Sequence, residues 1–266
     1  MIHINDLQTD AQRKHYIEAK LNTELIGKQL HYYRSITSTM DVARLLARSG
    51  ALEGTVVITD EQQSGRGRLN RTWISPGGVL AFSVILYPSL QMLPNLIMIA
   101  SVAVSQTIAE QFHLNARIKW PNDVLIEGKK VCGILIESEL KGNVVNFSSI
   151  GIGINVNYNP IGHPLIGQAA TCLSHECGYD VNKDDVACAV FQKFDELYLK
   201  VRAGGSVFED WRDSMKIIGK AIRVKTGRTV VEGVVAEVTT TGNLLLRQND
   251  DTMYEVIVGD VTVIKP

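Results

Sequence analysis

The hydrophobic and polar positions of this chain follow two kinds of repeat. Apolar residues recur at helical spacing in four segments, which are 42–46, 96–112, 184–203 and 207–215, and a weaker pattern predicts a surface helix over 6–22. Short runs rich in β-branched residues predict buried strands at 29–36, 55–59, 79–87 and 144–155. Strands and helices are both present in the first part of the chain, and we expect an α+β fold with a central mixed β-sheet and helices on one side.

The pattern changes at Gly219. From there onward, short strands are separated by turns such as Thr226-Gly227-Arg228 and Thr241-Gly242-Asn243. Short strands at this spacing are typical of a small SH3-like β-barrel. We therefore predict two domains, a larger one over residues 1–217 and a small β domain over residues 218–266.

One stretch concentrates charge on predicted strands. Residues 119–123 read Lys-Trp-Pro-Asn-Asp, and two apolar runs then flank a glycine-containing turn, which predicts a β-hairpin. The second run, residues 131–136, is apolar almost throughout, as expected of a strand buried on both faces. Lys119, Asp123 and Lys130 are costly to bury there unless they are paired or bind a ligand. A Pro-Asn-Asp turn with solvated lysines is the alternative.

A second polar segment lies between predicted strands. Residues 65–68 read Gly-Arg-Gly-Arg, and Arg71 and Trp73 follow. The glycines let the backbone turn tightly while the guanidinium groups converge, which suits an anion such as a phosphate chain. The segment is not a Walker A loop, because no Gly-Lys-Ser or Gly-Lys-Thr follows. A disordered basic tail is the alternative, and the position between strands argues against it.

Two further features have ordinary structural explanations. Ser38 and Asp41 fit the start of a helix with a capping box, and Gly50 fits the end of the same helix. Gly151 and Gly153 fit a β-bulge or close packing of strands. On the residues alone, capping is the preferred explanation for Ser38.

Composition limits the class of protein. The chain has 266 residues, is 45% hydrophobic and carries a net charge of −1, which gives no electrostatic basis for binding nucleic acid or an anionic membrane. Cys172, His175 and Cys177 have no second ligand pair at zinc-site spacing, so we expect free thiols. The apolar stretch 88–109 contains several polar residues and predicts a core helix rather than a membrane span. With no export signal at the N-terminus, we expect a cytoplasmic protein.

Taken together, these motifs resemble those of biotin protein ligases. The matching features are Gly-Arg-Gly-Arg with Arg71 and Trp73, Lys-Trp-Pro-Asn-Asp with Lys130 seven residues after its Asp, and Ile-Gly-Ile-Gly-Ile-Asn at 150–155. The resemblance extends from about Gln29 onward. It implies a catalytic sheet like that of class II synthetases and biotin and lipoate ligases, followed by the SH3-like domain.

The sequence also departs from that family's pattern. Asn70 stands where the family has glycine, and since asparagine tolerates positive φ we expect the turn to survive. Met40 stands where the family usually has asparagine beside the biotin ring. The segment before residue 29 is too short for the winged-helix DNA-binding domain of some members, so we expect a short form that does not bind DNA.

The resemblance implies an ATP-dependent ligase that works in two steps. The biotin carboxylate attacks the α-phosphate of ATP, giving biotinyl-5′-AMP and pyrophosphate. A lysine of a biotin carboxyl carrier domain, in acetyl-CoA carboxylase or a related carboxylase, then attacks the mixed anhydride. Two anions must meet while charge builds at the α-phosphate, so fixed cations are required. ATP is implied as co-substrate, Mg²⁺ as the metal and biotin as the substrate.

The matching residues are expected to take the family's roles. The catalytic candidates are Lys130 as the main cation, Arg68, and Asp123 as a Mg²⁺ ligand or a base for the second step. Trp73 and Trp120 are candidates for stacking on adenine or for the core. Biotin contacts are expected from Ser38, Thr39, Gln62, Gly65, Arg66, Arg68, Lys130, Gly133 and Gly151. Adenylate contacts are expected from Arg66, Arg68, Arg71, Trp73, Lys119, Asn122, Asp123, Lys130 and Asn155.

Two other functions stay open. Lipoate and octanoate ligases share the fold and a pocket lysine but differ in these motifs, and fold alone does not fix function. A non-enzymatic, biotin-responsive regulator is the other alternative, and the short N-terminus and small net charge argue against it. Homodimers through the sheet edge occur in the family, and the sequence leaves that question open. No membrane partner is expected.

Overall fold

A mixed β-sheet forms the larger part of the protein, whose computed structural model describes residues 11–161, 163 and 169–264. The sheet has seven strands in the order β1-β2-β3-β7-β6-β5-β4. β1 and β2 pair in parallel, and the other neighbouring strands are antiparallel, which confirms the predicted mixed sheet. The strands are β1 (Leu30–Ile36), β2 (Val56–Gln62), β3 (Val79–Leu86), β4 (Ala116–Lys119), β5 (Asp123–Ile126), β6 (Lys129–Lys141) and β7 (Val144–Asn155).

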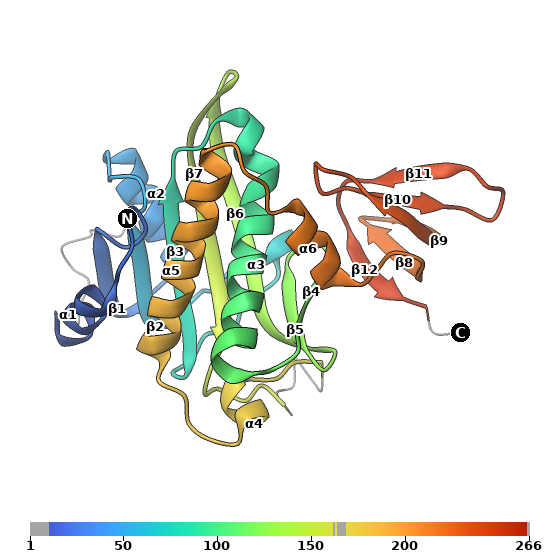
Figure 1. Ribbon diagram of the computed structural model, residues 1–266. Coiled ribbons are helices and arrows are strands. Elements are labelled where there is room, and N and C mark those ends of the chain that lie inside the picture. Colours follow the sequence, from blue (N-terminus) through green and yellow to red (C-terminus); the bar gives the residue numbers. More distant parts are fainter. Residues whose placement is uncertain (1–10, 162, 164–168, 265–266) are drawn as a thin grey trace.

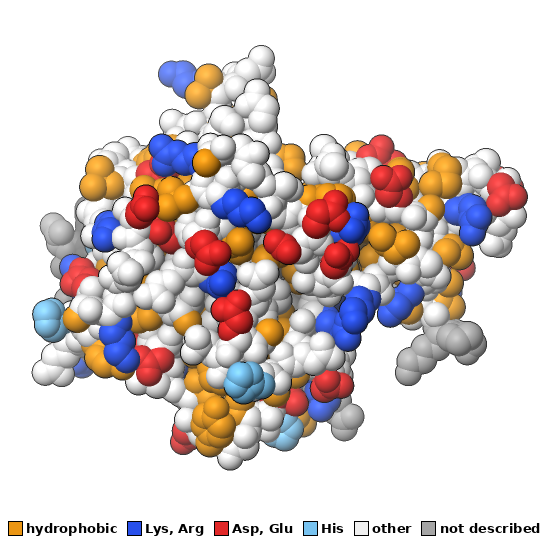
Figure 2. Space-filling model, in the orientation of Figure 1, with side chains coloured by type: hydrophobic (Ala, Val, Ile, Leu, Met, Phe, Trp, Pro, Cys, Tyr) orange, Lys and Arg blue, Asp and Glu red, His pale blue; other side chains and the backbone are white. Residues whose placement is uncertain are grey.

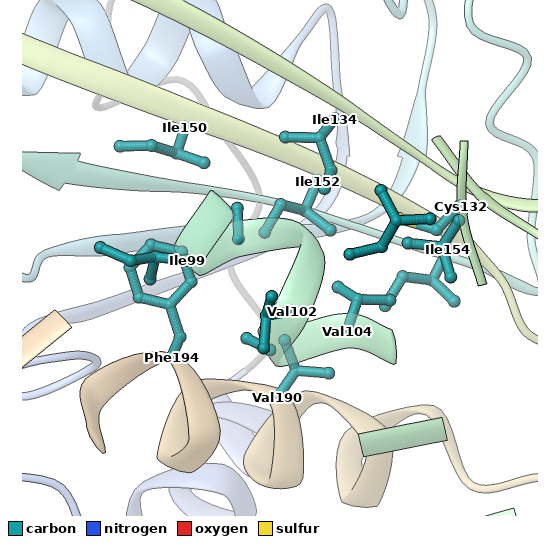
Figure 3. Close-up of a cluster of buried hydrophobic side chains, with 14 of the residues drawn as sticks. Ile99, Val102, Val104, Cys132, Ile134, Ile150, Ile152, Ile154, Val190 and Phe194 are labelled. Carbon is teal, nitrogen blue, oxygen red and sulfur yellow. The ribbon is translucent and has the colours of Figure 1, made fainter. Parts of the chain in front are cut away.

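Two long helices, α3 (Leu93–Phe112) and α5 (Lys183–Arg202), cover one face of this sheet (Figure 1). Figure 3 shows alternate residues of β7 in one buried cluster with side chains of both helices, since successive strand residues point to opposite faces; these residues are Ile150, Ile152 and Ile154. By length and composition α3 could cross a membrane, but most of it is buried inside the fold. It is therefore the core helix that the sequence predicts.

The shorter helices lie elsewhere. α2 (Thr39–Arg48) packs on the opposite face and builds a separate small core with residues of β1, β2 and β3, among them Tyr33, Val57 and Ile85. The prediction of helices on one side of the sheet holds for α3 and α5 but not for α2. The apolar face of α2 is buried against the opposite face of the sheet. The remaining helices are α1 (Ala11–Lys20), α4 (Leu173–Cys177) and α6 (Phe208–Met215), with 3-10 turns at Arg68–Asn70 and Leu90–Met92.

Local sequence signals predict most element ends correctly. Gly50 follows α2 with φ +83°, and the side chain of Asn182 caps α5 by accepting backbone hydrogen bonds. The predicted hairpin is present, with its turn at Glu127-Gly128. The helix predicted over 6–22 is present as α1, and its first predicted residues lie outside the described part. The prediction that Ser38 caps α2 is wrong, because its side chain makes no capping hydrogen bond.

A five-stranded antiparallel sheet follows α6, in the order β11-β10-β9-β8-β12. Its polar contacts with the larger domain include two hydrogen-bonded ones: the Nε1 group of Trp120 donates to the carbonyl of Gly242 at 2.8 Å, and Arg71, between β2 and β3, pairs with Asp260. Trp120 is buried by this contact, so it belongs to the core and is not a platform for adenine. The strands are β8 (Ala221–Thr226), β9 (Thr229–Val238), β10 (Leu244–Arg247), β11 (Met253–Val256) and β12 (Asp260–Val263).

Charge is spread over the helical face of the molecule. Figure 2 shows Lys and Arg side chains interspersed with Asp and Glu over the surface of the long helices. Some of these charges are paired, as Lys193 is with Glu110 and Glu196. The mixture of signs agrees with a net charge of −1 and gives this face no single-sign field.

Candidate active site

A pocket opens on the face of the sheet that carries α2. Its walls come from β6, β7, the start of α2 and residues 63–73, which we call the glycine-arginine loop. The space inside is about 50 Å³. Pockets for organic ligands usually measure roughly 300–1,000 Å³, so side chains or the loop must move to admit one. The predicted site residues that line the pocket are Ser38, Thr39, Gln62, Arg66, Arg68, Trp73, Asn122, Lys130, Gly133 and Gly151.

Lys130 reaches the pocket because β6 bulges beside it. The register of β6 against β5 slips by one residue at Val131. Val131 and Cys132 are both buried in the core, and the Nζ atom of Lys130 lies on the opposite face, 3.0 Å from where a Cβ on Gly133 would be. Without the bulge, the alternation of the strand would direct Lys130 into the core. The bulge therefore turns a charged side chain out of the interior and into the pocket.

The ammonium group of Lys130 is held in place by Asp123. Its Nζ atom lies 2.7 Å from Oδ1 of Asp123 and 5.4 Å from the centre of the Trp73 ring. Both side chains of the pair are largely withdrawn from water, and their mutual attraction offsets part of the cost of desolvation. The arrangement directs a cation at the pocket, where it can bind an anionic group.

Glycines form the floor of the pocket. A Cβ atom on Gly153 would lie 2.5 Å from the indole of Trp73, and one on Gly151 would lie 2.7 Å from the sulfur of Met40. Gly133 is similarly close to Trp73, at 3.1 Å. Any larger residue would push these side chains off the sheet. Because this face of β6 is a pocket floor, with part of it open to solvent, the predicted burial of the strand on both faces is wrong.

The start of α2 presents a buried hydroxyl group. The side chain of Ser38 is almost fully buried, and its Oγ atom has no hydrogen-bond partner among the described residues. Beside it, the backbone N–H of Thr39 donates to Oε1 of Gln62 at 2.9 Å, and its hydroxyl accepts from Ser83 at 2.8 Å. A buried hydroxyl is costly unless it gains a partner, which a polar ligand would supply. We call Ser38, Thr39 and Gln62 the polar end of the pocket.

The glycine-arginine loop folds back on itself. The N–H of Trp73 donates to the carbonyl of Gly65 at 2.9 Å, and the N–H of Gly67 donates to that of Arg71 at 2.7 Å. A Cβ atom on Gly65 would lie 2.3 Å from the carbonyl oxygen of Trp73, so glycine is required there. Asn70 adopts φ +58°, as its tolerance of the left-handed region predicts.

Two arginines of the loop lie at the pocket with different partners. Arg66 pairs with Asp41 at 2.9 Å and with Glu137 at 3.2 Å. Arg68 donates a hydrogen bond to Oδ1 of Asn122 at 2.9 Å and has no carboxylate partner at ion-pair distance among the described residues. Burial lowers the pKa of the Arg68 guanidinium below its ordinary value, which marks a partly desolvated cation. An anion in the pocket would stabilise it.

Comparisons with known proteins identify this arrangement. Residues 32–155 match the Biotin/lipoate A/B protein ligase family, and residues 217–263 match the Biotin protein ligase C terminal domain. The bifunctional ligase/repressor BirA of Bacillus subtilis is 37% identical over 236 residues, which are 86% of this chain and 73% of that protein. The biotin–[acetyl-CoA-carboxylase] ligase of Mycobacterium tuberculosis is 30% identical over 92% of this chain and 94% of that protein.

The chain belongs to the biotin protein ligase family. A solved structure agrees with this assignment and with the fold. The biotin protein ligase from Aquifex aeolicus, in complex with biotin and ATP, superimposes with a TM-score of 0.76 and 28% sequence identity, over 90% of this chain and all of that one.

In this biotin protein ligase, some predicted site residues lie outside the pocket lining: Gly65, Arg71, Lys119, Asp123 and Asn155. Lys119 is exposed at the end of β4. Asn155 is buried at the end of β7, where its Nδ2 group donates to the carbonyl of Thr171 at 2.9 Å. Gly65 and Arg71 shape and fasten the loop, and Asp123 acts on the pocket through Lys130.

The pocket of this ligase also contains residues that the sequence reasoning did not select. Gly153 repeats the role of Gly151 two positions along the same strand, and that spacing of two is the signal that could have marked it. Met40, which departs from the family pattern, lies over Gly151 on the floor of the pocket. The remaining lining residues are Gly67, which belongs to the Gly-Arg-Gly-Arg motif, and Ile134, Leu135 and Ile152, which the sequence does not distinguish from core residues.

A metal ion in this ligase would have few protein ligands. Within the described part of the chain, no group of three or more His, Cys, Asp or Glu side chains could hold one. The pocket lining includes no described carboxylate, and Asp123 is paired with Lys130. Mg²⁺ often keeps several waters and binds through one or two carboxylates together with substrate phosphates. The donor set therefore fits a Mg²⁺ ion that arrives with ATP and is held mainly by the phosphates, and Asp123 stays the predicted protein ligand.

Proposed function

We propose that this chain is an ATP-dependent biotin protein ligase, which makes biotinyl-5′-AMP and then an amide bond on a carrier lysine. The observation that carries the proposal is Lys130, turned by the bulge onto a glycine floor whose far side ends in the buried hydroxyl of Ser38. A cation at one end and an unsatisfied polar group at the other suit a ligand with a carboxylate and a polar ring. The relatives named as biotin ligases support biotin and ATP as the substrates.

In the first step, the polar ring of biotin lies against Ser38 and Gln62, and its carboxylate points to Lys130. A carboxylate oxygen attacks the α-phosphorus of ATP, so that a new O–P bond forms as the bond to pyrophosphate breaks. Lys130 neutralises both anions as they approach, and Arg66 and Arg68 add positive charge around the phosphate. Fixed cations lower the barrier because they need no reorganisation during the reaction.

The nucleotide is proposed to lie on the Trp73 side of the pocket. The indole offers an apolar face for adenine, and its Nε1 group is buried without a hydrogen-bond partner among the described residues. Asn122 accepts a hydrogen bond from Arg68, and both residues line the same pocket as Trp73. When Mg²⁺ is bound with the phosphates, it supplies a Lewis acid that reduces their negative charge.

In the second step, the neutral amino group of an acceptor lysine attacks the carbonyl carbon of the anhydride. A C–N bond forms, the C–O bond to AMP breaks, and the new nitrogen loses a proton. Asp123 is the candidate base, because its carboxylate lies beside Lys130 at the edge of the pocket. The closed glycine-arginine loop keeps water from the anhydride until the acceptor arrives.

We propose that the acceptor, a biotin carboxyl carrier domain, docks along the free edge of β6. Beyond Ile134, which bonds to Asn122, the described residues pair this strand with β7 alone. The unpaired N–H and C=O groups can accept an added strand. The edge starts at Leu135, which also lines the pocket, so a lysine on the added segment has a short path to the anhydride. A homodimer through the same edge is the competing occupant.

The wider organisation of the chain is also proposed. The boundary between residues 217 and 218 lies between α6 and β8, just before Gly219 with φ +79°. The small net charge supports a protein without DNA contact. Four free cysteines among the described residues suit a reducing cytoplasm.

The test is release of pyrophosphate from Mg-ATP with biotin, lipoate or octanoate supplied one at a time. Turnover with biotin alone, and a tightly held adenylate, is the expected result. Turnover with lipoate or octanoate would assign the fold to a different acid. Absence of turnover with all three would refute the ligase and leave the regulator.

A further inference from the structure

The backbone of Lys130 lies beyond the end of the pairing of β6 with β7, which itself ends at Asn155. That pairing begins only at Cys132, opposite Ile154. Lys130 keeps its pairing with Leu125 of β5, beside the bulged residue Val131, so one side of its backbone is left for another segment. Here the N–H of Lys130 donates to the carbonyl of Ala169 at 2.9 Å, and its carbonyl accepts from the N–H of Thr171 at 2.9 Å. The segment 169–171 thus takes the place that β7 vacates.

Thr171 is held from three directions. Its side chain is fully buried, and its backbone N–H binds Lys130 on β6. Its carbonyl accepts a hydrogen bond from the Nδ2 group of Asn155, at the end of β7, at 2.9 Å. Its hydroxyl donates to the carboxylate of Glu176 on α4. Every polar atom of this threonine is therefore used, and each bond leads to a different element.

The carboxylate of Glu176 holds the segment 169–171 through its hydrogen bond with Thr171. The helix that carries it is tied to the main sheet, because the N–H of Ser174 donates to the carbonyl of Val156 at 2.9 Å. A hydroxyl group bound to a carboxylate makes a charge-assisted hydrogen bond, which is stronger than one between neutral groups. A chain of hydrogen bonds therefore runs from α4 through Thr171 to the backbone of Lys130.

We propose that Thr171 and Glu176 are positioning residues for Lys130, holding the bulge in the conformation that points the ammonium group at the reacting anions. This inference rests on the proposed ligase function. Neither residue lines the pocket, so both act through Lys130 and not on substrate. Small displacements are costly in such a site, since a shift of about 1 Å can slow a reaction by roughly a hundredfold.

The test measures the rate of pyrophosphate release in a single turnover, with saturating biotin and Mg-ATP. Thr171→Val removes the hydroxyl and keeps the shape, and Glu176→Ala removes the acceptor from a partly buried position; each should slow the step by about ten- to a hundredfold. Thr171→Ser keeps the hydroxyl and should recover most of the rate. Thr107→Val is the matched control, because this buried hydroxyl on α3 has no hydrogen-bond partner among the described residues, and its rate should equal that of the wild type.

The deciding comparison repeats Thr171→Val in a Lys130→Ala background. With no ammonium group left to position, the second substitution should cause no further slowing. Equal slowing in both backgrounds would overturn the proposal, because Thr171 would then act independently of Lys130. Equal rates for the valine and serine variants would overturn it too. If the wild type releases no pyrophosphate with biotin, the ligase function itself fails, before any variant is compared.

Discussion

Replacing Ser38 with alanine is expected to change stability and biotin affinity in opposite directions. The side chain is 1% exposed, and its hydroxyl has no partner among the described residues. A buried, unpaired hydroxyl costs about 1–3 kcal/mol, and its removal leaves only a small void. As Ser38 makes no capping hydrogen bond, alanine loses none. The ligand-free variant should therefore be more stable than the wild type by about 1 kcal/mol.

When biotin is bound, the same substitution is expected to be unfavourable. If its polar ring supplies the missing partner, Ser38→Ala loses a buried hydrogen bond of about 1–3 kcal/mol, and biotin should bind about 5- to 150-fold more weakly. Urea unfolding without ligand measures the first effect, and calorimetric titration with biotin measures the second. Ser149→Ala is the control, since this hydroxyl is also buried without a partner but does not line the pocket. It should gain similar stability and keep its affinity.

Two results would refute this reasoning. A ligand-free Ser38→Ala variant that unfolds more easily than the wild type would show that the hydroxyl has a structural partner. An unchanged affinity for biotin would show that the ring lies elsewhere, and the assignment of the polar end of the pocket would fail.

Three further substitutions test other parts of the site and fold. Lys130→Ala should slow adenylate formation by about 10²–10³-fold, with a much smaller loss of ATP binding; rapid-quench rates beside equilibrium titrations check this, and equal losses would contradict it. Arg68→Gly should release adenylate into solution, seen by mass spectrometry as labelling of bystander lysines; labelling confined to the acceptor would count against shielding by the loop. Burial alone would raise the pKa of Asp60, but its bonds with Lys183 and its attraction to Arg13 lower it below the ordinary value. The resulting stability is present above about pH 4 and is lost as the pH falls through the lowered pKa. Asp60→Asn should therefore unfold with a weaker dependence on acid below about pH 4; curves parallel to those of the wild type would contradict this.

Signals that depend on a few neighbouring residues predicted structure well. Gly50 ends its helix, Asn70 turns the loop, and the hairpin before Lys130 forms as its pattern indicates. Each of these features depends on the backbone preferences of one or two residues, which are known from the residue types alone. Most of the candidate residues selected from the family motifs also line one pocket.

Features set by distant contacts could not be predicted. The sequence from Val131 to Ile136 does not indicate that the register of β6 against β5 slips at Val131. The slip depends on how β5 and the segment 169–171 pair with β6. Ser38 fits a capping residue equally well by sequence, and only its burial without a bond separates the two roles. Trp120 donates its hydrogen bond to Gly242, which is far along the chain. No local sequence pattern could therefore exclude Trp120 from the nucleotide site.

The two faces of β7 have a consequence for laboratory evolution of this enzyme. Ile150, Ile152 and Ile154 face the core under the long helices, whereas Gly151 and Gly153 face the pocket. Mutations of the isoleucines on the core face reduce the stability of the protein. Mutations of the glycines on the other face change the shape of the pocket with little effect on the core. A library that varies Gly151 together with Met40, and Gly153 together with Trp73, could therefore search for enzymes that accept reshaped acids while the scaffold tolerates the change.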